Sequence, residues 1–407
     1  MKKTNRRYAY QQKSEIYAQR LGLLPPYLFV QIDRKTKELK EKGVDIINLG
    51  VGDPDLPTPE HIVKKGQEAL ANPIHHRYPF GAGLKQFRQA VAKWYKQRFA
   101  VDLDPDNEVH SLIGSKEGIG HLPLAFVNPG DVVLVPEPGY PVYKASTIFA
   151  GGVPSFLPLK EENNFLPDLT KIPAKILKKT KLLFLNYPNN PTTACANENF
   201  FYGVVKLAKK NRIIVAHDAA YSEIYFPSEV AEGFSPPLSF LSIPEARDVG
   251  VEFHSLSKTY NMTGWRIGFV VGNKKIIQGL ATVKDNFDSG VFQAVQVAGV
   301  TALTGPQECI EEMRQIYRER RDIFVQGLKD LGWNVKNPEA TFYVWAKIPK
   351  KYTSIKFVEK LLSETGIICT PGSGLGPSGE GYVRFALTVD NERLKEAVKR
   401  MKKIVKW

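Results

Sequence analysis

The sequence contains little cysteine. Its 407 residues include three cysteines, Cys195, Cys309 and Cys369, which are scattered along the chain. Their spacing matches neither a metal-ligand pattern nor the paired framework of a disulfide-rich domain. This excludes a small disulfide-stapled scaffold and a structural zinc module. Free cysteines are typical of a reducing compartment, so we expect a cytoplasmic protein.

Long hydrophobic runs are also missing. No apolar stretch approaches the roughly 20 residues that a membrane span needs, and no apolar core of a secretory signal follows the basic residues 1–15. We therefore expect no membrane partner. The adjacent histidines His75 and His76 have no further ligand at a suitable spacing, so we assign no metal site to them.

The net charge of +14 needs an explanation, because basic proteins often bind nucleic acids or anionic substrates. The basic residues are spread along segments with a helical pattern, and most have acidic neighbours. We find no helix-turn-helix and no aromatic-basic RNA motif. We interpret the charge as a solvated lysine-rich surface and expect no nucleic-acid partner.

A chain of this length predicts more than one domain. From residue 108 onward, apolar strands alternate with helices, which predicts an α/β fold with a mostly parallel sheet between helices. After about residue 290 the pattern changes to helices and short strands, typical of a smaller α+β domain. We expect a large domain over 50–295 and a small C-terminal domain over 296–407. Residues 1–49 would form an N-terminal arm and part of the small domain.

Polar or aromatic side chains follow several predicted strands directly. They are Ser115, Tyr140, Asn190, Asp218 and Lys258. In open sheets of this class, ligands bind beyond the carboxyl ends of the strands. This shared placement is the strongest indication of a single binding site.

The stretch 253–272 has a composition suited to phosphate. It holds Lys258, with Ser255 and Ser257 upstream and Arg266 downstream between two glycines. A guanidinium and two hydroxyls can bind a phosphate dianion through charge-assisted bonds. A lysine beside a bound phosphate suggests the Schiff-base lysine of a pyridoxal phosphate enzyme. The alternative is a loop with a surface lysine.

Two charged residues occupy apolar surroundings. Asp218 ends an apolar strand, where a carboxylate is costly to bury without a partner, and a protonated pyridine nitrogen would be one. Arg384 lies inside another apolar strand. A substrate carboxylate would be its natural partner, with an internal salt bridge as the alternative. The glycine-rich segment 372–376 has no following helix, so we reject a dinucleotide-binding loop there.

Together these motifs resemble a known family. S-x-S-K followed by G-x-R-x-G, with N-x-P earlier and D-x-x-Y between them, is a specific combination. It resembles the fold-type I pyridoxal phosphate aminotransferases of the aspartate aminotransferase class, and the resemblance covers nearly the whole chain. Stretches such as NLGVGDPDLPTPEHI and EFHSLSKTYNMTGWRIGF resemble the branch of that class that acts on LL-diaminopimelate.

The resemblance implies roles for individual residues. Lys258 would hold pyridoxal phosphate and move a proton between the substrate Cα and the cofactor C4′. Asp218 would pair with the pyridine nitrogen, while Tyr221 and Asn190 would bond the ring phenolate oxygen. The other implied cofactor contacts are Ser115, Lys116, Tyr140, Ser255, Ser257, Arg266 and, from a second subunit, Tyr78. The implied substrate contacts are Tyr27, Gly50, Lys116, Tyr140, Asn190, Asn286 and Arg384, with Arg384 on the α-carboxylate.

The implied reaction is transamination between LL-2,6-diaminopimelate with 2-oxoglutarate and tetrahydrodipicolinate with glutamate, in lysine biosynthesis. The family works as a homodimer with a shared active site. An aspartate, alanine or aromatic amino acid aminotransferase on the same scaffold is the first alternative. A transcription regulator with an aminotransferase-like domain is another, although the residues ahead of Tyr27 leave no room for its winged helix.

Three positions depart from the family pattern. Thr193, Ala219 and Asp285 stand where the family usually has glycine, asparagine and serine. None of them removes a catalytic group, so we expect them to affect only the fine shape of the pocket.

Overall fold

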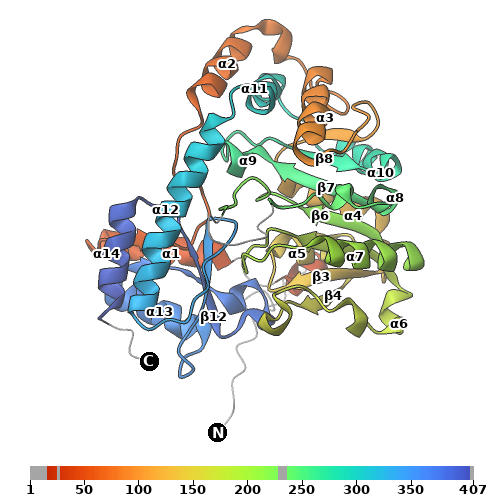
Figure 1. Cartoon of the computed structure of the whole chain (residues 1–407). Helices are drawn as coiled ribbons and strands as arrows, with labels where there is room; N and C mark the ends of the chain where they lie inside the picture. Colours follow the sequence, from red (N-terminus) through yellow and green to blue (C-terminus); the bar gives the residue numbers. More distant parts are fainter. Residues whose placement is uncertain (1–15, 25–27, 228–235, 404–407) are drawn as a thin grey trace.

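A seven-stranded sheet forms the centre of the computed structural model, which describes residues 16–24, 28–227 and 236–403 (Figure 1). The strand order is β2-β8-β7-β6-β5-β3-β4. The strands are β2 (Val109–Leu112), β3 (Val132–Glu137), β4 (Val153–Pro158), β5 (Thr180–Asn186), β6 (Ile214–Asp218), β7 (Gly250–Ser255) and β8 (Gly268–Gly272). Only β8 runs antiparallel to its neighbours in this sheet. The prediction of a mostly parallel sheet is confirmed.

Both faces of this sheet are covered by helices. Along β5, Leu183 and Leu185 join one buried cluster and Leu182 and Phe184 join the other, because successive side chains point to opposite faces. Helices α4 (Ser115–Phe126), α5 (Pro141–Phe149) and α10 (Lys274–Asp285) pack on the second face. Helices α3 (Lys85–Phe99) and α7 (Glu198–Asn211) pack on the first. Apolar residues on both faces explain the continuous apolar runs in the sequence.

A second, smaller region is built from both ends of the described chain. Its antiparallel sheet has the order β11-β12-β9, formed by Thr370–Pro371, Tyr382–Ala386 and Tyr343–Lys347. Beside it, β1 (Ile47–Asn48) pairs in parallel with β10 (Ile367–Ile368). Helices α1 (Leu28–Glu41), α13 (Ser354–Thr365) and α14 (Asn391–Met401) belong to this region (Figure 1). The predicted smaller α+β region is therefore present.

Long helices join the two regions. Helix α12 (Glu308–Asp330) runs from the neighbourhood of α11 (Gln293–Thr304) to α14 (Figure 1). Helix α11 packs against α3 and against α2 (Glu60–Ala71), and the predicted boundary at 295/296 falls within it. The domain limits stay a prediction. The short helices are α6 (Ala174–Leu177), α8 (Ala246–Val249) and α9 (Leu256–Thr259).

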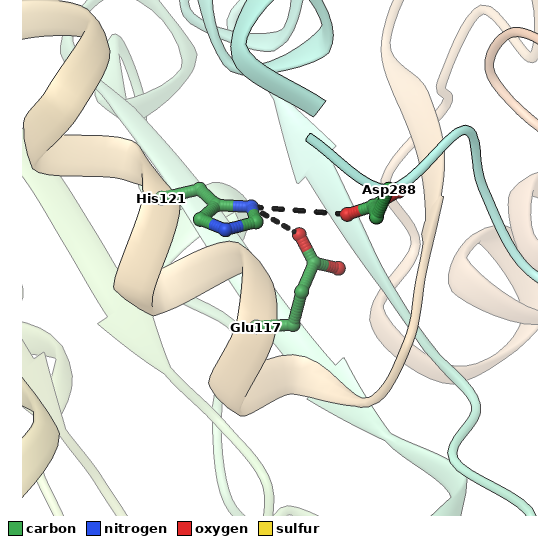
Figure 2. A group of neighbouring side chains, drawn as sticks. All are labelled: Glu117, His121 and Asp288. Atoms are coloured by element: carbon green, nitrogen blue, oxygen red, sulfur yellow. Dashed lines mark ion pairs between the residues drawn. The ribbon is translucent and has the colours of Figure 1, made fainter. Parts of the chain in front are cut away.

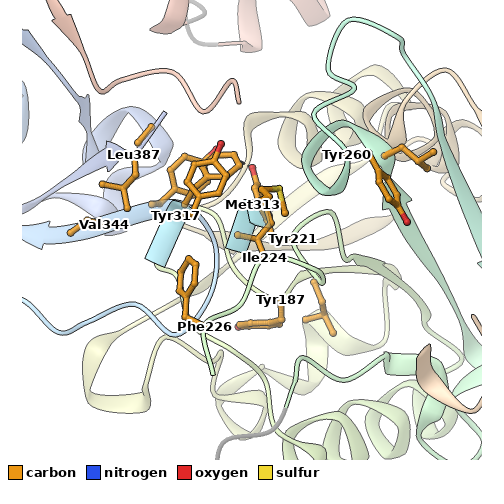
Figure 3. Close-up of a cluster of buried hydrophobic side chains, with 14 of the residues drawn as sticks. Tyr187, Tyr221, Ile224, Phe226, Tyr260, Met313, Tyr317, Val344 and Leu387 are labelled. Carbon is orange, nitrogen blue, oxygen red and sulfur yellow. Dashed lines mark hydrogen bonds between the residues drawn. The ribbon is translucent and has the colours of Figure 1, made fainter. Parts of the chain in front are cut away.

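A buried cluster connects the two sheets beside the strand ends. Figure 3 shows Tyr221 and Ile224, from the segment after β6, next to Met313 and Tyr317 of α12. Val344 and Leu387 of the small region complete it. This core fixes the small sheet against the carboxyl edge of the large one.

Among the described residues, no helix is both long and apolar enough to cross a membrane.

Candidate active site

A cavity of about 360 Å³ lies at the carboxyl ends of the large-sheet strands. It brings together all five residues that follow predicted strands. The predicted site residues that line it are Ser115, Lys116, Tyr140, Asn190, Asp218, Tyr221, Ser255, Ser257, Lys258, Arg266 and Arg384. Its lining also includes residues that sequence reasoning missed: Val51, Gly52, Asp53, Tyr143, Asn186, Ala220, Thr263 and Tyr343.

Lys258 lies in α9, the short helix that directly follows β7. Its Nζ donates a hydrogen bond of 2.8 Å to the carbonyl oxygen of Gly52. Burial lowers the Lys258 pKa to about 8; the nearby Asp53 charge raises it, while the Arg266 and Arg384 charges lower it further. A large fraction of this amine is therefore neutral near pH 8, as a nucleophile or a general base requires.

Asp218 is the last residue of β6 and is almost completely buried. Tyr143 Oη donates to its Oδ2 at 2.8 Å, and the Ala220 N–H donates to its Oδ1 at 3.3 Å. Burial raises the pKa of Asp218, although the bond from Tyr143 acts in the opposite direction. A buried carboxylate at the cavity wall is a fitting partner for a cationic ring nitrogen.

The amino end of α4 forms one corner of the cavity. Ser115 is its first residue, and the first N–H groups of a helix lack intrahelical acceptors, which makes this end attractive to anions. The preceding residue, Gly114, has φ = 72°, and a Cβ there would lie 2.4 Å from Nη2 of Arg266. A side chain at position 114 would have to displace the guanidinium, so the glycine leaves this corner open to Arg266. This close approach was not predicted.

The two glycines around Arg266 differ in their surroundings. A Cβ on Gly268 would lie 2.9 Å from the Ser115 nitrogen, so this glycine lets β8 pack against the start of α4. A Cβ on Gly264 would meet no atom within 4 Å. Neither glycine is among the residues that line the cavity. Arg266 has φ = 54°, a left-handed conformation that is uncommon for a side chain of this size.

Two serines complete this corner. Ser255 Oγ accepts a bond from the Ser257 N–H at 3.2 Å. Ser257 Oγ is buried and has no hydrogen-bond partner among the described residues. A buried hydroxyl without a partner carries a desolvation penalty that a bound acceptor would remove. With Arg266 and the helix end, these hydroxyls form a set of donors for one anionic group.

Four side chains form a connected network on the opposite wall. Arg384 donates through Nη1 to Asn190 Oδ1 at 2.7 Å, and through Nη2 to the Gly50 carbonyl oxygen at 2.8 Å. Asn190 Nδ2 lies 3.5 Å from Tyr221 Oη, which lies 2.9 Å from Tyr343 Oη. Thr370 Oγ1 accepts a further bond from Nη2 of Arg384 at 3.3 Å. Arg384 is thus a buried cation whose guanidinium is fixed by several hydrogen bonds at the cavity.

Some predicted site residues lie elsewhere. Gly50 is not part of the lining; its carbonyl oxygen instead orients Arg384. Tyr78 is 74% exposed and stacks on Phe80, and Asn286 is exposed at the end of α10, so neither reaches the cavity of its own chain. Tyr27 lies outside the described residues.

The departures from the family pattern fall near the cavity or the surface. Thr193 has φ = 66°, a conformation that glycine adopts freely and a β-branched residue seldom does. Ala219 is buried, and its N–H donates to the Phe253 carbonyl oxygen. Asp285 is exposed at the end of α10.

A cluster of charged groups is formed by residues of α4 and of the turn after α10. Figure 2 shows His121 paired with both Glu117 and Asp288, and the ligand atoms of the three residues lie within 4.8 Å of one another. However, Nζ of Lys284 lies 2.8 Å from Glu117 and 3.0 Å from Asp288, and its side chain is 1% exposed. The Lys284 ammonium group already pairs with both carboxylates, so we assign no metal to this cluster.

A second buried carboxylate, Glu252, lies on the strand that pairs with the one ending at Asp218. Glu252 of β7 is opposite His217 of β6, and His217 Nδ1 lies 2.9 Å from Glu252 Oε2. His254 Nε2, Tyr95 Oη and the Phe240 N–H provide the other bonds to Glu252, at 2.8, 2.5 and 2.7 Å. Because the Tyr187 N–H donates to His217 Nε2, the His217 proton resides on Nδ1. Sequence reasoning did not identify this network.

Comparisons with known proteins agree with this geometry. Residues 44–401 match the family model "Aminotransferase class I and II". An LL-diaminopimelate aminotransferase from Syntrophobacter fumaroxidans is 57% identical over 96% of this chain and 99% of its own length. One from Aquifex aeolicus is 56% identical over 95% and 99%. The structure of apo-BacF from Bacillus subtilis superposes with a TM-score of 0.91 and 41% identity, covering 96% of this chain and 98% of BacF.

Proposed function

Since the chain belongs to the class I and II aminotransferases and has their fold-type I architecture, we propose that it transfers amino groups with pyridoxal phosphate bound in the cavity described above. The observation that carries this proposal is Lys258, a buried lysine with a pKa of about 8 in the same cavity as the buried carboxylate of Asp218. When bound, the cofactor supplies a carbonyl carbon for the substrate amine and a ring that accepts the electron pair released at Cα.

The donor set fits this cofactor. Ser115, Lys116, Ser255, Ser257 and Arg266 would hold the phosphate, and the buried Ser257 hydroxyl would gain the acceptor that the described residues do not give it. Asp218 would face the pyridine nitrogen, and Tyr140 would stack on the ring. Tyr221 and Asn190 would donate to the ring oxygen.

The remaining steps belong to side chains of the protein. Lys258 in its neutral form would bond the cofactor, leave it when a substrate amine arrives, and then hold the proton removed from Cα. Arg384 would grip the substrate α-carboxylate with its planar guanidinium, which is oriented by Asn190 and Gly50. Lys116, Tyr140 and Asn190 would contact the substrate as well, and we keep Tyr27 among the proposed contacts.

We propose LL-2,6-diaminopimelate as the amino-acid substrate and 2-oxoglutarate as its acceptor, in the lysine pathway and physiologically in the direction of diaminopimelate synthesis. Relatives that bear the name LL-diaminopimelate aminotransferase are 52–57% identical over about 95% of the chain, which supports this choice.

A spectroscopic experiment tests the substrate. The cofactor-loaded protein is mixed separately with LL-diaminopimelate, meso-diaminopimelate, aspartate, alanine and glutamate, and loss of the visible cofactor absorbance is followed. Rapid conversion by the LL isomer and glutamate alone is the expected result. Conversion by aspartate or alanine, with none by LL-diaminopimelate, would move the enzyme to the general aminotransferase alternative.

We propose further that two copies form a homodimer with shared active sites. Tyr78 and Phe80 are both 74% exposed, and Phe287 is 68% exposed beside Asn286. A Cβ on Gly290 would lie 2.4 Å from the Pro79 carbonyl oxygen, so the turn after α10 packs on the loop that carries Tyr78. Tyr78 would reach the phosphate of the other subunit, and Asn286 would reach its substrate.

Hybrid dimers test this sharing. Tyr78→Phe and Lys258→Ala variants, each of which we expect to have little activity alone, are mixed after mild dissociation. If Tyr78 serves the other subunit, a hybrid dimer contains one intact site and regains about a quarter to a half of the activity of the wild type. If Tyr78 served its own subunit, mixing would restore nothing.

We place the enzyme in the cytoplasm, a proposal supported by its three free cysteines.

A further inference from the structure

We propose that Tyr343 is a positioning residue that directs the hydrogen bond of Tyr221 through its hydroxyl and orients Arg384 through its ring. This inference rests on the proposed function, because Tyr221 is expected to bond the cofactor ring oxygen. Tyr343 is the first residue of β9 in the small sheet, it is 2% exposed, and it lines the cavity. The sequence motifs imply no role for it.

The hydroxyl contact has only one workable direction in the loaded enzyme. Tyr343 Oη and Tyr221 Oη are 2.9 Å apart, and both side chains are buried. A phenol has one proton to donate. When the Tyr221 proton is directed at the cofactor ring oxygen, the proton between the two tyrosines must come from Tyr343. Asn190 Nδ2, 3.5 Å from Tyr221 Oη, points a second donor at the same oxygen.

Bonds that point the same way strengthen one another. A donor aimed at Tyr221 Oη makes the Tyr221 proton a better donor to an anionic acceptor. Tyr343 would therefore stabilise the anionic form of the ring oxygen without touching it. The pKa of the bound cofactor, read from its visible absorbance, is the quantity that this arrangement changes.

The Tyr343 ring makes a separate contact with Arg384, the residue proposed to bind the substrate α-carboxylate. The Arg384 guanidinium carbon lies 4.3 Å from the ring centroid. A guanidinium over an aromatic face is attracted by the ring quadrupole, and the stacking restricts its plane. Together with the bonds to Asn190 and Gly50, the ring fixes the direction in which Arg384 presents its donors.

The loop after β1 holds the Tyr343 hydroxyl in place. A Cβ on Gly52 would lie 1.9 Å from Tyr343 Oη, so the backbone at this position is pressed against the hydroxyl. The carbonyl oxygen of the same glycine accepts the bond from Lys258. The Tyr343 hydroxyl is thus packed between the Gly52 backbone and Tyr221 Oη, and this packing restricts movement of the side chain away from Tyr221.

Two substitutions separate the two contacts. Tyr343→Phe removes the hydroxyl and keeps the ring, whereas Tyr343→Leu removes both. In cofactor-loaded protein, we expect both variants to raise the pKa of the visible absorbance by roughly half a unit. The dissociation constant of glutarate, an unreactive dicarboxylate, should stay within about twofold in Tyr343→Phe and rise roughly tenfold or more in Tyr343→Leu.

Tyr317→Phe is the matched control. Tyr317 is fully buried and contacts Phe342, its hydroxyl has no hydrogen-bond partner among the described residues, and it does not line the cavity. This variant should change neither quantity. Circular dichroism melting of all three variants checks that each is folded at the assay temperature.

The outcomes distinguish the inference from the function on which it rests. A wild-type protein that develops no visible band with pyridoxal phosphate would overturn both. A normal wild-type band with an unchanged pKa in Tyr343→Phe would overturn the hydroxyl role and leave the proposed function intact. Unchanged glutarate binding in Tyr343→Leu would likewise overturn the role of the ring.

Discussion

Arg384 and Asn190 are 194 positions apart in the chain and share a hydrogen bond of 2.7 Å at the wall of the cavity. Arg384 belongs to β12 of the small sheet, and Asn190 follows β5 of the large sheet. The bond therefore spans the two regions of the fold at the point where they enclose the site. Arg384, proposed to bind the substrate, and Asn190, proposed to bind the cofactor, are in direct contact. A substitution of one residue should therefore change the position of the other.

Replacing Arg384 by leucine should weaken the binding of every amino acid substrate. The change removes the charge-assisted hydrogen bonds to the α-carboxylate. It also leaves Asn190 Oδ1 and the Gly50 carbonyl oxygen without the guanidinium donor. We expect KM for glutamate and for LL-diaminopimelate each to rise about 100-fold. A loss confined to diaminopimelate would show that Arg384 binds the distal end of that substrate instead.

The reactivity of Lys258 should follow its lowered pKa. The rate at which apoprotein bonds pyridoxal phosphate should rise with pH and level off above about pH 8, because the neutral amine is the reacting form. Stopped-flow absorbance measures this rate. A rate that keeps rising toward pH 10 would mean that the lysine has an ordinary pKa.

The same shift affects the stability of the apoprotein. Between pH 8 and 10.5 the unfolded chain keeps a proton on Lys258 that the folded chain has lost. Stability therefore gains from this group as pH rises through that window, by at most about 1.4 kcal/mol per pH unit. Lys258→Met should lack this gain in urea unfolding titrations. Parallel curves for the two proteins would contradict the assignment.

Gly52→Ala should inactivate the enzyme although it adds a single methyl group. That methyl would overlap the Tyr343 hydroxyl and displace the loop whose carbonyl oxygen accepts from Lys258. We expect kcat/KM to fall at least about 100-fold, a loss typical of small misplacements at reacting groups. Gly264→Ala is the control, since a methyl there meets nothing within 4 Å. Equal effects in both variants would point to a general loss of loop flexibility.

Lys284→Met should destabilise the protein far more than a surface substitution. It leaves Glu117 and Asp288 facing each other without the ammonium group that now pairs with both. We expect a loss of about 3–5 kcal/mol in the free energy of unfolding, as for other broken buried ion pairs. Lys274→Met, at an exposed position of the same helix, should change it by less than about 0.5 kcal/mol. If the Lys284 variant were as stable as this control, the pairing would have little energetic value.

Glu252→Gln should lower stability at neutral pH and much less in acid. Although burial alone would raise it, the hydrogen bonds from His217 and His254 hold the pKa of Glu252 below its ordinary value. A carboxyl group of this kind stabilises the fold above its unfolded pKa of about 4.5, and the gain is lost as pH falls toward the folded pKa. The difference between wild type and variant should therefore shrink below pH 4.5 in chemical denaturation curves. A constant difference would exclude ionised Glu252 as its source.

The arrangement of the large sheet could be predicted from the sequence because its strands are short apolar runs that end in polar residues. Asp218 and Lys258 were placed correctly at the cavity since the carboxyl ends of parallel strands meet at one edge. Helix α10 was not predicted, and its buried face explains why. Ile276, Ile277 and Leu280 follow a helical period, but Lys284 completes that face as a buried ion.

The rest of the site depends on contacts between distant segments. Tyr343 lies in an apolar strand and looks like any core tyrosine until the fold brings it to Tyr221, 122 positions away. No local pattern shows that the backbone of Gly52 is pressed against the Tyr343 hydroxyl. Glu252 and His254 alternate in a strand, and only the pairing with β6 brings His217 beside them.

The pairing of β1 with β10 has a consequence for synthesis of the protein. Ile47 lies opposite Ile367, so the first strand lacks its neighbour until 320 more residues have been made. At about 5–20 residues per second, a ribosome needs roughly 16 to 64 s for that length. Ile47 and Leu49, both buried in the finished fold, lack their β10 neighbours throughout this time. The nascent chain therefore offers chaperones an apolar segment near its beginning, and the segment is withdrawn only when the C-terminal region emerges.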